Sequence, residues 1–200
     1  MKTDADFYLS IHVETTGLNS NIDQNVNEGH SIVAIGVSVC DKDFNKVDDK
    51  IIFIDSGLNN EEIVPEFNGI TKEFLSEEGI SEEDAVIEFA NFILEYFSPN
   101  DNIVCLGQNV QYFCIPFLKE LLYKYEVYIN FACNALDVFS LTTPTLGELS
   151  LKEVVEVFGD VDNLPPFYQQ EEYACLLKTY AFIEVFRRIN KQWNRMIKKT

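Results

Sequence analysis

The sequence predicts an α/β protein built on a mixed β-sheet that helices cover on both faces. Three strand-like stretches rich in β-branched residues come first, and helical periodicity begins only at Ser81. Beyond that point strand-like and helical segments alternate, which is typical of parallel strands joined by helices. The chain has 200 residues, 46% of them hydrophobic, enough to bury one sizeable core. We therefore expect residues 1–186 to form a single domain.

The N-terminal strands are expected to form an antiparallel meander. Residues 7–13, 31–40 and 50–55 read as strands, and polar, turn-forming stretches separate them. His12 and Glu14 lie two residues apart in the first strand, so both side chains point to the same face.

Apolar residues at three- and four-residue steps predict the helices that follow. Ser81 and the acidic residues after it are a typical helix start, and Pro99 follows the end of that helix. The expected elements are, in order, a helix over 81–97, a strand over 102–107, a helix around 113–122, a strand entering a helix over 128–141, a short helix over 149–159 and an amphipathic helix over 170–189.

Charge is the strongest signal in the composition. The net charge is −18, but residues 187–200 hold six of the fifteen basic residues and no acidic one. Residues 1–186 therefore carry nine basic against 33 acidic residues, a net charge near −24. Such a surface repels phosphate, which disfavours nucleic acid and favours a protein partner with a basic surface. The basic segment 187–200 is either a phosphate-binding patch or the helix end and tail, where cations suit the helix dipole.

The sequence also bears on the compartment. No run of eighteen apolar residues occurs and the N-terminus lacks the regions of a signal peptide, so no membrane association is expected. Five cysteines without a C-x-x-C spacing argue against a disulfide framework. We expect a cytoplasmic protein.

Several stretches resemble, in their order along the chain, the motifs and connecting segments of the DEDDh 3′–5′ exonucleases. "HVETTG" at 12–17 is similar to the first motif, D-x-E-T-T-G, and "CLGQNVQYFCIPFL" at 105–118 is similar to the second, G-H-N-x-x-F-D-x-x-F-L. "IVPEFNGITKEFL" at 63–75 resembles the loop before the first long helix, and "YQQEEYA" at 168–174 falls where the third motif, H-x-x-x-x-D-A, belongs. The resemblance implies a ribonuclease-H-like fold with a five-stranded sheet.

The same resemblance implies a site that has lost most of its catalytic residues. In the family, four carboxylates hold two divalent metals, Mg²⁺ or Mn²⁺, and a His acts as general base. Here Glu14 is retained, and the four substituted positions are His12, Cys114, Tyr168 and Tyr173. The chain is therefore expected to be an inactive exonuclease-fold protein that needs no cofactor.

Two alternatives keep a metal at the site. A related subfamily pairs a Tyr with an acid four residues later, and Tyr168 and Glu172 have that spacing. This pair together with Glu14 would support residual Mg²⁺ or Mn²⁺ nuclease activity. Alternatively His12, Glu14 and Cys114 offer nitrogen, oxygen and sulfur ligands, a set better suited to Zn²⁺. Against both stands a structural interpretation, in which Cys114 and the tyrosines fill the volume of the lost ligands.

The residues that line the terminal-nucleotide pocket in the family are better retained. They correspond to Thr15, Thr16, Gly17, Leu18, Asn109 and Phe113. A structural role fits equally well, because Gly17 permits a tight turn and the threonines can bond to the loop backbone. His30 is expected to be a solvated loop residue.

Three functions therefore compete. The first is a non-catalytic binding, regulatory or scaffolding module, and the second is a 3′–5′ exonuclease or exoribonuclease with a non-standard metal site. The third is a module that binds nucleic-acid 3′ ends, with the cations Arg187, Arg188, Lys191, Arg195, Lys198 and Lys199 in contact with phosphate.

Overall fold

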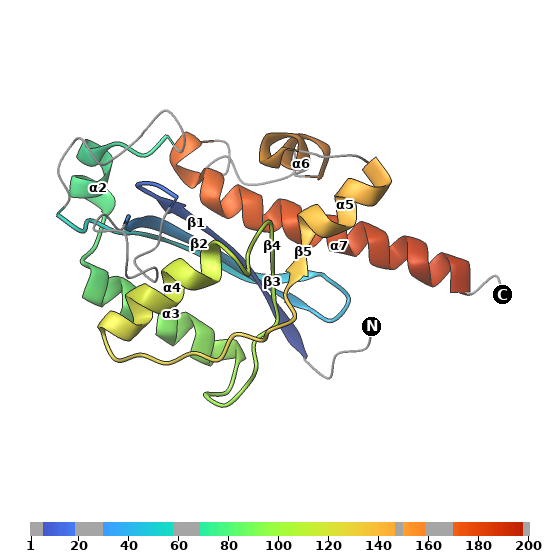
Figure 1. Cartoon of the computed structure of the whole chain (residues 1–200), viewed down its shortest axis with the longest axis horizontal. Helices are drawn as coiled ribbons and strands as arrows, with labels where there is room; N and C mark the ends of the chain where they lie inside the picture. The colour runs from blue at the N-terminus through green and yellow to red at the C-terminus, as the bar shows by residue number, and fades with distance from the viewer. Residues whose placement is uncertain (1–5, 19–29, 58–68, 147–149, 159–169, 198–200) are drawn as a thin grey trace.

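The computed structural model describes residues 6–18, 30–57, 69–146, 150–158 and 170–197. Within these residues, five strands form one sheet in the order β3-β2-β1-β4-β5 (Figure 1). The strands are β1 (Phe7–Thr15), β2 (Ile32–Asp41), β3 (Lys46–Phe53), β4 (Cys105–Gly107) and β5 (Leu136–Asp137).

The sheet is mixed, as the sequence predicts. β1, β2 and β3 form the antiparallel meander, with His12 opposite Gly36 and Glu14 opposite Ala34. β4 runs parallel to β1, and β5 runs parallel to β4. The Asp41 carboxylate closes the turn between β2 and β3, because it accepts hydrogen bonds from the backbone of Asp43 and Asn45 at 2.8 and 2.9 Å.

The helices begin close to the positions that their caps predict. Ser81 accepts a hydrogen bond from the Asp84 backbone at 3.1 Å and caps the first long helix. One short helix was not expected from the sequence: it follows Thr71, whose hydroxyl caps the Phe74 backbone. The helices are α2 (Lys72–Glu78), α3 (Glu82–Tyr96), α4 (Cys114–Lys124), α5 (Val138–Leu146), α6 (Leu151–Phe158) and α7 (Ala174–Ile197), with a 3₁₀ turn, η4 (Glu171–Tyr173), before α7.

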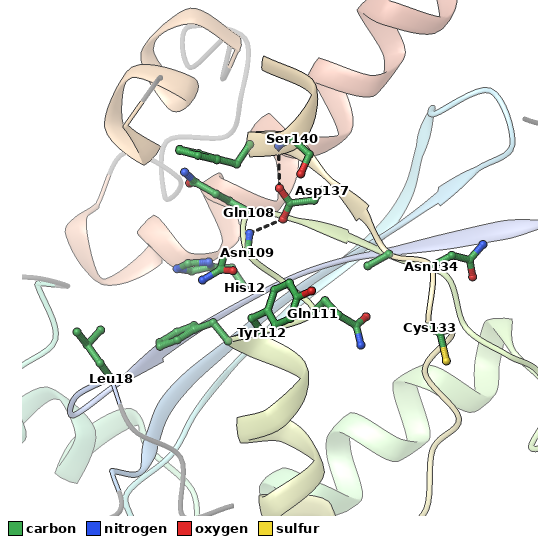
Figure 2. Close-up of a pocket in the computed structure, with 13 residues that line it drawn as sticks. His12, Leu18, Gln108, Asn109, Gln111, Tyr112, Cys133, Asn134, Asp137 and Ser140 are labelled. Carbon is green, nitrogen blue, oxygen red and sulfur yellow. Dashed lines mark hydrogen bonds between the residues drawn. The ribbon is translucent and has the colours of Figure 1, made fainter. Parts of the chain in front are cut away.

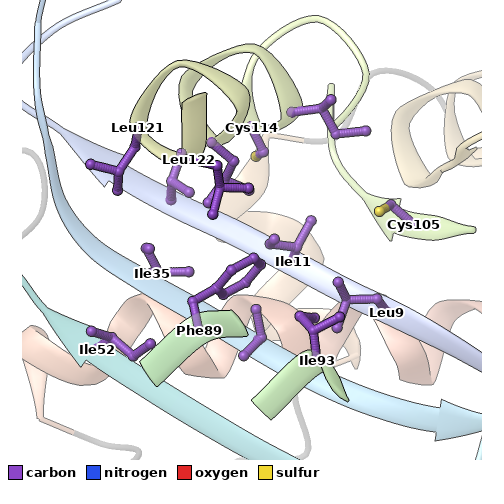
Figure 3. Close-up of a cluster of buried hydrophobic side chains, with 14 of the residues drawn as sticks. Leu9, Ile11, Ile35, Ile52, Phe89, Ile93, Cys105, Cys114, Leu121 and Leu122 are labelled. Carbon is purple, nitrogen blue, oxygen red and sulfur yellow. The ribbon is translucent and has the colours of Figure 1, made fainter. Parts of the chain in front are cut away.

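Helices cover both faces of the sheet, because β1 alternates between two sets of side chains. Leu9, Ile11 and Val13 point into a core that α3 and α4 complete (Figure 3). Ser10 points to the opposite face, where its hydroxyl donates to the Thr179 carbonyl of α7 at 2.8 Å. Figure 1 shows α7 crossing this second face and extending beyond the sheet.

The last helix differs from its predicted bounds. It begins at Ala174 rather than at 170 and continues to Ile197, so residues 187–197 of the basic segment form the end of α7. Gly159, expected to close the helix before it, lies outside the described residues. None of the helices in the described part of the chain has the length and apolar character that crossing a membrane requires.

Candidate functional site

The C-terminal half of β1 places His12 and Glu14 on the face that α7 covers. The two side chains point the same way, as their spacing predicts, and the two residues are only 8% and 9% exposed. His12 Nε2 lies 3.4 Å from Glu14 Oε1. A polar pair buried to this extent needs partners, because an unpaired buried charge is costly.

Lys178 of α7 supplies the partner. Its ammonium forms an ion pair with Glu14 Oε1 and lies 3.4 Å from His12 Nε2. The Lys178 side chain is only 15% exposed, so the contact is largely shielded from water. The candidate site is therefore a buried His12, Glu14 and Lys178 cluster with its own internal cation.

Close packing of α7 on the sheet brings Lys178 to this position. A Cβ at Gly36 would fall 2.8 Å from the Cys175 backbone, so the glycine in β2 permits the helix to approach. Cys175 Sγ donates to the His12 carbonyl at 3.1 Å. One turn further on, Thr179 contacts the hydroxyl of Ser38 at 2.7 Å. These contacts fix the height of Lys178 above β1.

The electrostatics of the cluster favour a neutral His12 and an ionised Glu14. Burial and the nearby Lys178 charge lower the pKa of His12 below its ordinary value of 6.5, and Glu14 opposes them less strongly. Burial alone would raise the pKa of Glu14, but His12 and Lys178 outweigh it and lower that pKa. The negative charge of Glu14 is therefore balanced by Lys178 rather than by the imidazole.

Cys114, which aligns with a family aspartate, lies near enough to be affected by the charges of Glu14 and Lys178, but its thiol is buried. It lies at the start of α4 and is fully buried in the hydrophobic core on the α3 and α4 side of the sheet (Figure 3). Burial raises the pKa of its thiol to about 12, so the sulfur stays protonated at neutral pH. Cys114 thus has the environment of a small hydrophobe.

The structure places Tyr173, from the third motif, beside strand β3. Tyr173 lies in η4 and packs edge-on against Phe53 of β3, with ring centroids 5.5 Å apart. Tyr168 lies outside the described residues, so its pairing with Glu172 in η4 cannot be placed. The side chain that reaches Glu14 and His12 from this end of the chain is Lys178.

The residues present do not fit the two-metal centre of the exonucleases. Among the described residues, no group of three or more His, Cys, Asp and Glu side chains is arranged to hold a metal ion, and the set His12, Glu14 and Cys114 is no exception. The Lys178 ammonium contacts Glu14, the carboxylate that a divalent cation would require. Zn²⁺ would also require the Cys114 thiolate, which burial disfavours.

The threonines of the Thr-Thr-Gly turn form hydrogen bonds with the backbone of the turn and of Ser31. Thr15 Oγ1 donates to the Gly17 carbonyl at 2.6 Å, and Thr16 Oγ1 accepts from the Ser31 backbone at 3.1 Å. Gly17 leaves room for the imidazole of His30, which a Cβ would strike. His30 is thus packed on the turn and half-buried, rather than the solvated loop residue expected from the sequence.

Three of the expected nucleotide-pocket residues line a cavity of about 800 Å³ next to His12, which we call the His12 cavity (Figure 2). Leu18, Asn109 and Phe113 belong to this lining, whereas Thr15, Thr16 and Gly17 do not. The full lining is His12, Leu18, Gln108, Asn109, Gln111, Tyr112, Phe113, Cys133, Asn134, Ala135, Asp137, Phe139 and Ser140.

Asp137 holds the two segments of the cavity wall together. Its carboxylate accepts from the Asn109 backbone at 2.6 Å and from the Ser140 backbone at 2.9 Å (Figure 2). The second contact caps α5, and the first fixes a turn in which Asn109 adopts a φ of 53°. Asparagine is among the few residues that tolerate this left-handed conformation. Asn109 therefore shapes the cavity through its backbone.

Sequence comparison by motif missed Lys178 and most of the cavity. Lys178 could have been found from helical spacing, because it lies on the buried stripe that Cys175 and Phe182 define. The lining residues between Cys133 and Ser140 carried no such signal. They come close to Gln108 only because β4 pairs with β5, and this contact between distant segments is not visible as a local pattern in the sequence.

Similarity to solved structures identifies the fold. No family model and no curated protein sequence matches the chain. E. coli Exonuclease I in complex with an oligonucleotide matches 98% of this chain with a TM-score of 0.66 and 12% identity. The nuclease domain of 3′hExo, a DEDDh family member, bound to rAMP, matches 96% of this chain with a TM-score of 0.65 and 12% identity. The chain therefore has a DEDDh-exonuclease-like fold, which confirms the predicted ribonuclease-H-like architecture.

The match differs in extent between these proteins. This chain corresponds to 42% of the E. coli Exonuclease I chain and to 95% of the 3′hExo nuclease domain. It thus spans about two fifths of the length of Exonuclease I.

Proposed function

We propose that this chain is a non-catalytic member of the exonuclease fold that acts by binding a protein partner, as a regulatory or scaffolding module. The observation that carries the proposal is the contact of the Lys178 ammonium with Glu14, the one family carboxylate that is retained. Two-metal hydrolysis needs carboxylates free to ligate divalent cations. A buried ammonium in contact with Glu14 repels such a cation and occupies its ligand.

The charge of the chain supports a protein partner with a basic surface. Residues 1–186 carry a net charge near −24. Complementary potentials accelerate association with a basic protein and oppose the approach of phosphate. All five cysteines are free, which suits a reducing compartment, and we place the protein in the cytoplasm.

The test of the non-catalytic assignment is a nuclease assay with a metal analysis. The purified chain and its Glu14→Gln variant are incubated with 3′-labelled single-stranded DNA and RNA in the presence of Mg²⁺, Mn²⁺ or Zn²⁺. E. coli Exonuclease I serves as the positive control. We expect no cleavage above the Glu14→Gln background and no divalent metal in the purified protein. Metal-dependent cleavage that disappears in Glu14→Gln would establish the alternative, a 3′–5′ exonuclease with a non-standard site.

A second candidate function is the binding of nucleic-acid 3′ ends without hydrolysis. Leu18, Asn109 and Phe113, which correspond to nucleotide-pocket residues of the family, line the His12 cavity and favour it. Against it, Arg187 and Arg188 both contact Glu184 of the same helix, and that carboxylate partly offsets their attraction for phosphate. This function predicts a steep salt dependence of oligonucleotide affinity. Deletion of residues 187–200 should then weaken binding, and unchanged affinity would exclude that role for the segment.

A further inference from the structure

We propose that the His12 cavity binds an arginine side chain that a basic segment of a partner protein presents. This inference deepens the proposed binding function and rests on it. The argument depends on the charge of the cavity wall, its hydrogen-bonding atoms, its aromatic rings and its size.

The cavity wall has the charge that a cation requires. Among the described residues of the lining, Asp137 is the only Asp or Glu, and none is Lys or Arg. His12 faces the cavity as a neutral imidazole, since its pKa is lowered. Lys178 lies behind His12 and its charge is balanced by Glu14. A cation is therefore attracted to the wall, whereas a phosphate meets a carboxylate with no opposing charge.

Hydrogen-bond acceptors in the wall lack donors. His12 Nδ1, Gln108 Oε1 and Gln111 Oε1 are shielded from solvent and find no hydrogen-bond partner among the described residues. His12 Nε2 lies 3.4 Å from both the Glu14 carboxylate and the Lys178 ammonium, and Nδ1 is an acceptor in the tautomer that carries its proton on Nε2. A guanidinium carries five N–H donors and no acceptor, and the two shielded amide oxygens would have to turn toward the cavity to accept from it.

Aromatic rings at the cavity favour arginine among cations. Tyr112 is 83% exposed and Phe139 is 38% exposed, although both line the cavity. A guanidinium stacks on such faces and forms hydrogen bonds in its plane at the same time, which a lysine ammonium cannot do. The exposed rings thus provide a stacking surface beside the acceptors.

The size of the cavity indicates a segment of protein rather than a free cation. Its volume of about 800 Å³ lies in the range of sites that take a whole drug-sized ligand. An arginine side chain alone fills only a part of that space. The flanking residues of a peptide would fill the rest, against Leu18 and the amide of Asn134.

The experiment is an NMR titration of the isotope-labelled full chain with a Gly/Ser peptide that carries one central arginine. Matched peptides carry citrulline, lysine or glutamate at that position, and free arginine amide is titrated separately. EDTA is present throughout. We expect the arginine peptide to shift the side-chain amides of Gln108 and Gln111 and to bind about tenfold more tightly than the citrulline peptide. Cys133, the one exposed cysteine of the five, should react more slowly with a maleimide when the peptide is bound.

Two variants and two matched controls locate the site. Asp137→Asn removes the charge and leaves one acceptor oxygen for the Asn109 and Ser140 backbone N–H groups, and it should weaken the arginine peptide by about tenfold. Tyr112→Ala removes an exposed ring and should weaken it by about threefold. Asp43→Asn and Tyr128→Ala make the same changes at exposed residues outside the cavity and should leave the affinity unchanged.

Several outcomes would overturn the assignment. The first is an equal affinity for the arginine and citrulline peptides, and the second is an equal loss of peptide affinity in Asp43→Asn and Asp137→Asn. The others are free arginine amide that binds as tightly as the peptide, and an oligonucleotide that displaces the peptide. No cleavage is possible in EDTA, so a failure here concerns only the occupant of the cavity. Glu14-dependent nuclease activity, in contrast, would contradict the proposed function and leave the peptide result standing.

Discussion

At the scale of single residues, the charge of Glu14 depends on the ammonium of Lys178. The two side chains are 11% and 15% exposed, so water compensates little for the loss of either one. Lys178→Met leaves the carboxylate buried without its cation, and we expect it to lower the free energy of unfolding by about 3 kcal/mol. Urea denaturation followed by circular dichroism measures this change.

The double variant separates loss of the charge pair from loss of packing. In Lys178→Met/Glu14→Gln no charge remains in the cluster, so most of the lost stability should return. A double variant as unstable as Lys178→Met would show that the methylene packing of the lysine, and not the ion pair, stabilises this part of the fold.

The lowered pKa of His12 predicts how the stability of the fold responds to acid. Its pKa is lowered in the folded state, so below its ordinary value of 6.5 the unfolded chain binds a proton that the folded chain does not. Stability should therefore fall as the pH drops through 6.5. The Glu14 pKa is also lowered, so its contribution is complete above 4.5 and is lost only at lower pH. Urea midpoints on either side of pH 6.5 report the His12 step.

The chain contains one other histidine, which offers a matched control. His12→Asn should lose the stability change around pH 6.5, and His30→Asn should keep it. The same acid response in His12→Asn and in the unsubstituted chain would exclude His12 as its source.

At the scale of elements, β1 is predictable from the sequence and the register of α7 is not. Leu9, Ile11 and Val13 alternate with more polar residues, and this period of two fixes which face meets which helix. The position of α7 follows instead from Gly36, which permits Cys175 to approach the sheet. That contact joins residues far apart in sequence. Alignment by motif therefore predicted Tyr173 as the site residue from this end of the chain, whereas the structure places Lys178 beside Glu14.

The same helix is fixed to the sheet by buried hydroxyls. Thr179 Oγ1 donates to the Leu176 carbonyl at 2.7 Å and lies 2.7 Å from Ser38 Oγ, and both hydroxyl residues are fully buried. Thr179→Val keeps the shape and leaves the Ser38 hydroxyl without this partner. We expect a loss of about 2 kcal/mol in the free energy of unfolding, measured by urea denaturation.

A second substitution tests that explanation. Ser38→Ala in the Thr179→Val background removes the hydroxyl that has lost its Thr179 partner, so the double variant should be more stable than Thr179→Val alone. Further destabilisation would show that the cost arises from altered packing between α7 and β2.

At the scale of the whole molecule, the order of strands and helices in the sequence was sufficient to predict the mixed sheet and its two helical layers. The His12 cavity could not be predicted in the same way. Its walls come from the turn at Asn109 and from residues 133–140, which meet because β5 pairs with β4 over only two residues. Patterning predicts which segments are strands, but a pairing this short leaves no periodic signal.

The net charge of −18 predicts how the whole fold responds to salt. With 33 acidic residues against fifteen basic ones, like charges dominate the long-range interactions, and compaction brings them together. Surface pairs such as Lys50 with Glu88, 3.0 Å apart, contribute little to stability, so their weakening by salt costs little.

Raising the ionic strength from about 0.01 M to about 0.15 M shortens the screening length from about 30 to about 8 Å and should reduce the repulsion between the acidic residues. We expect the thermal midpoint to rise by about 3 °C, which corresponds to about 1 kcal/mol for a chain of this size. A midpoint that falls with added NaCl would mean that exposed ion pairs, which salt screens, outweigh the repulsion between the acidic residues.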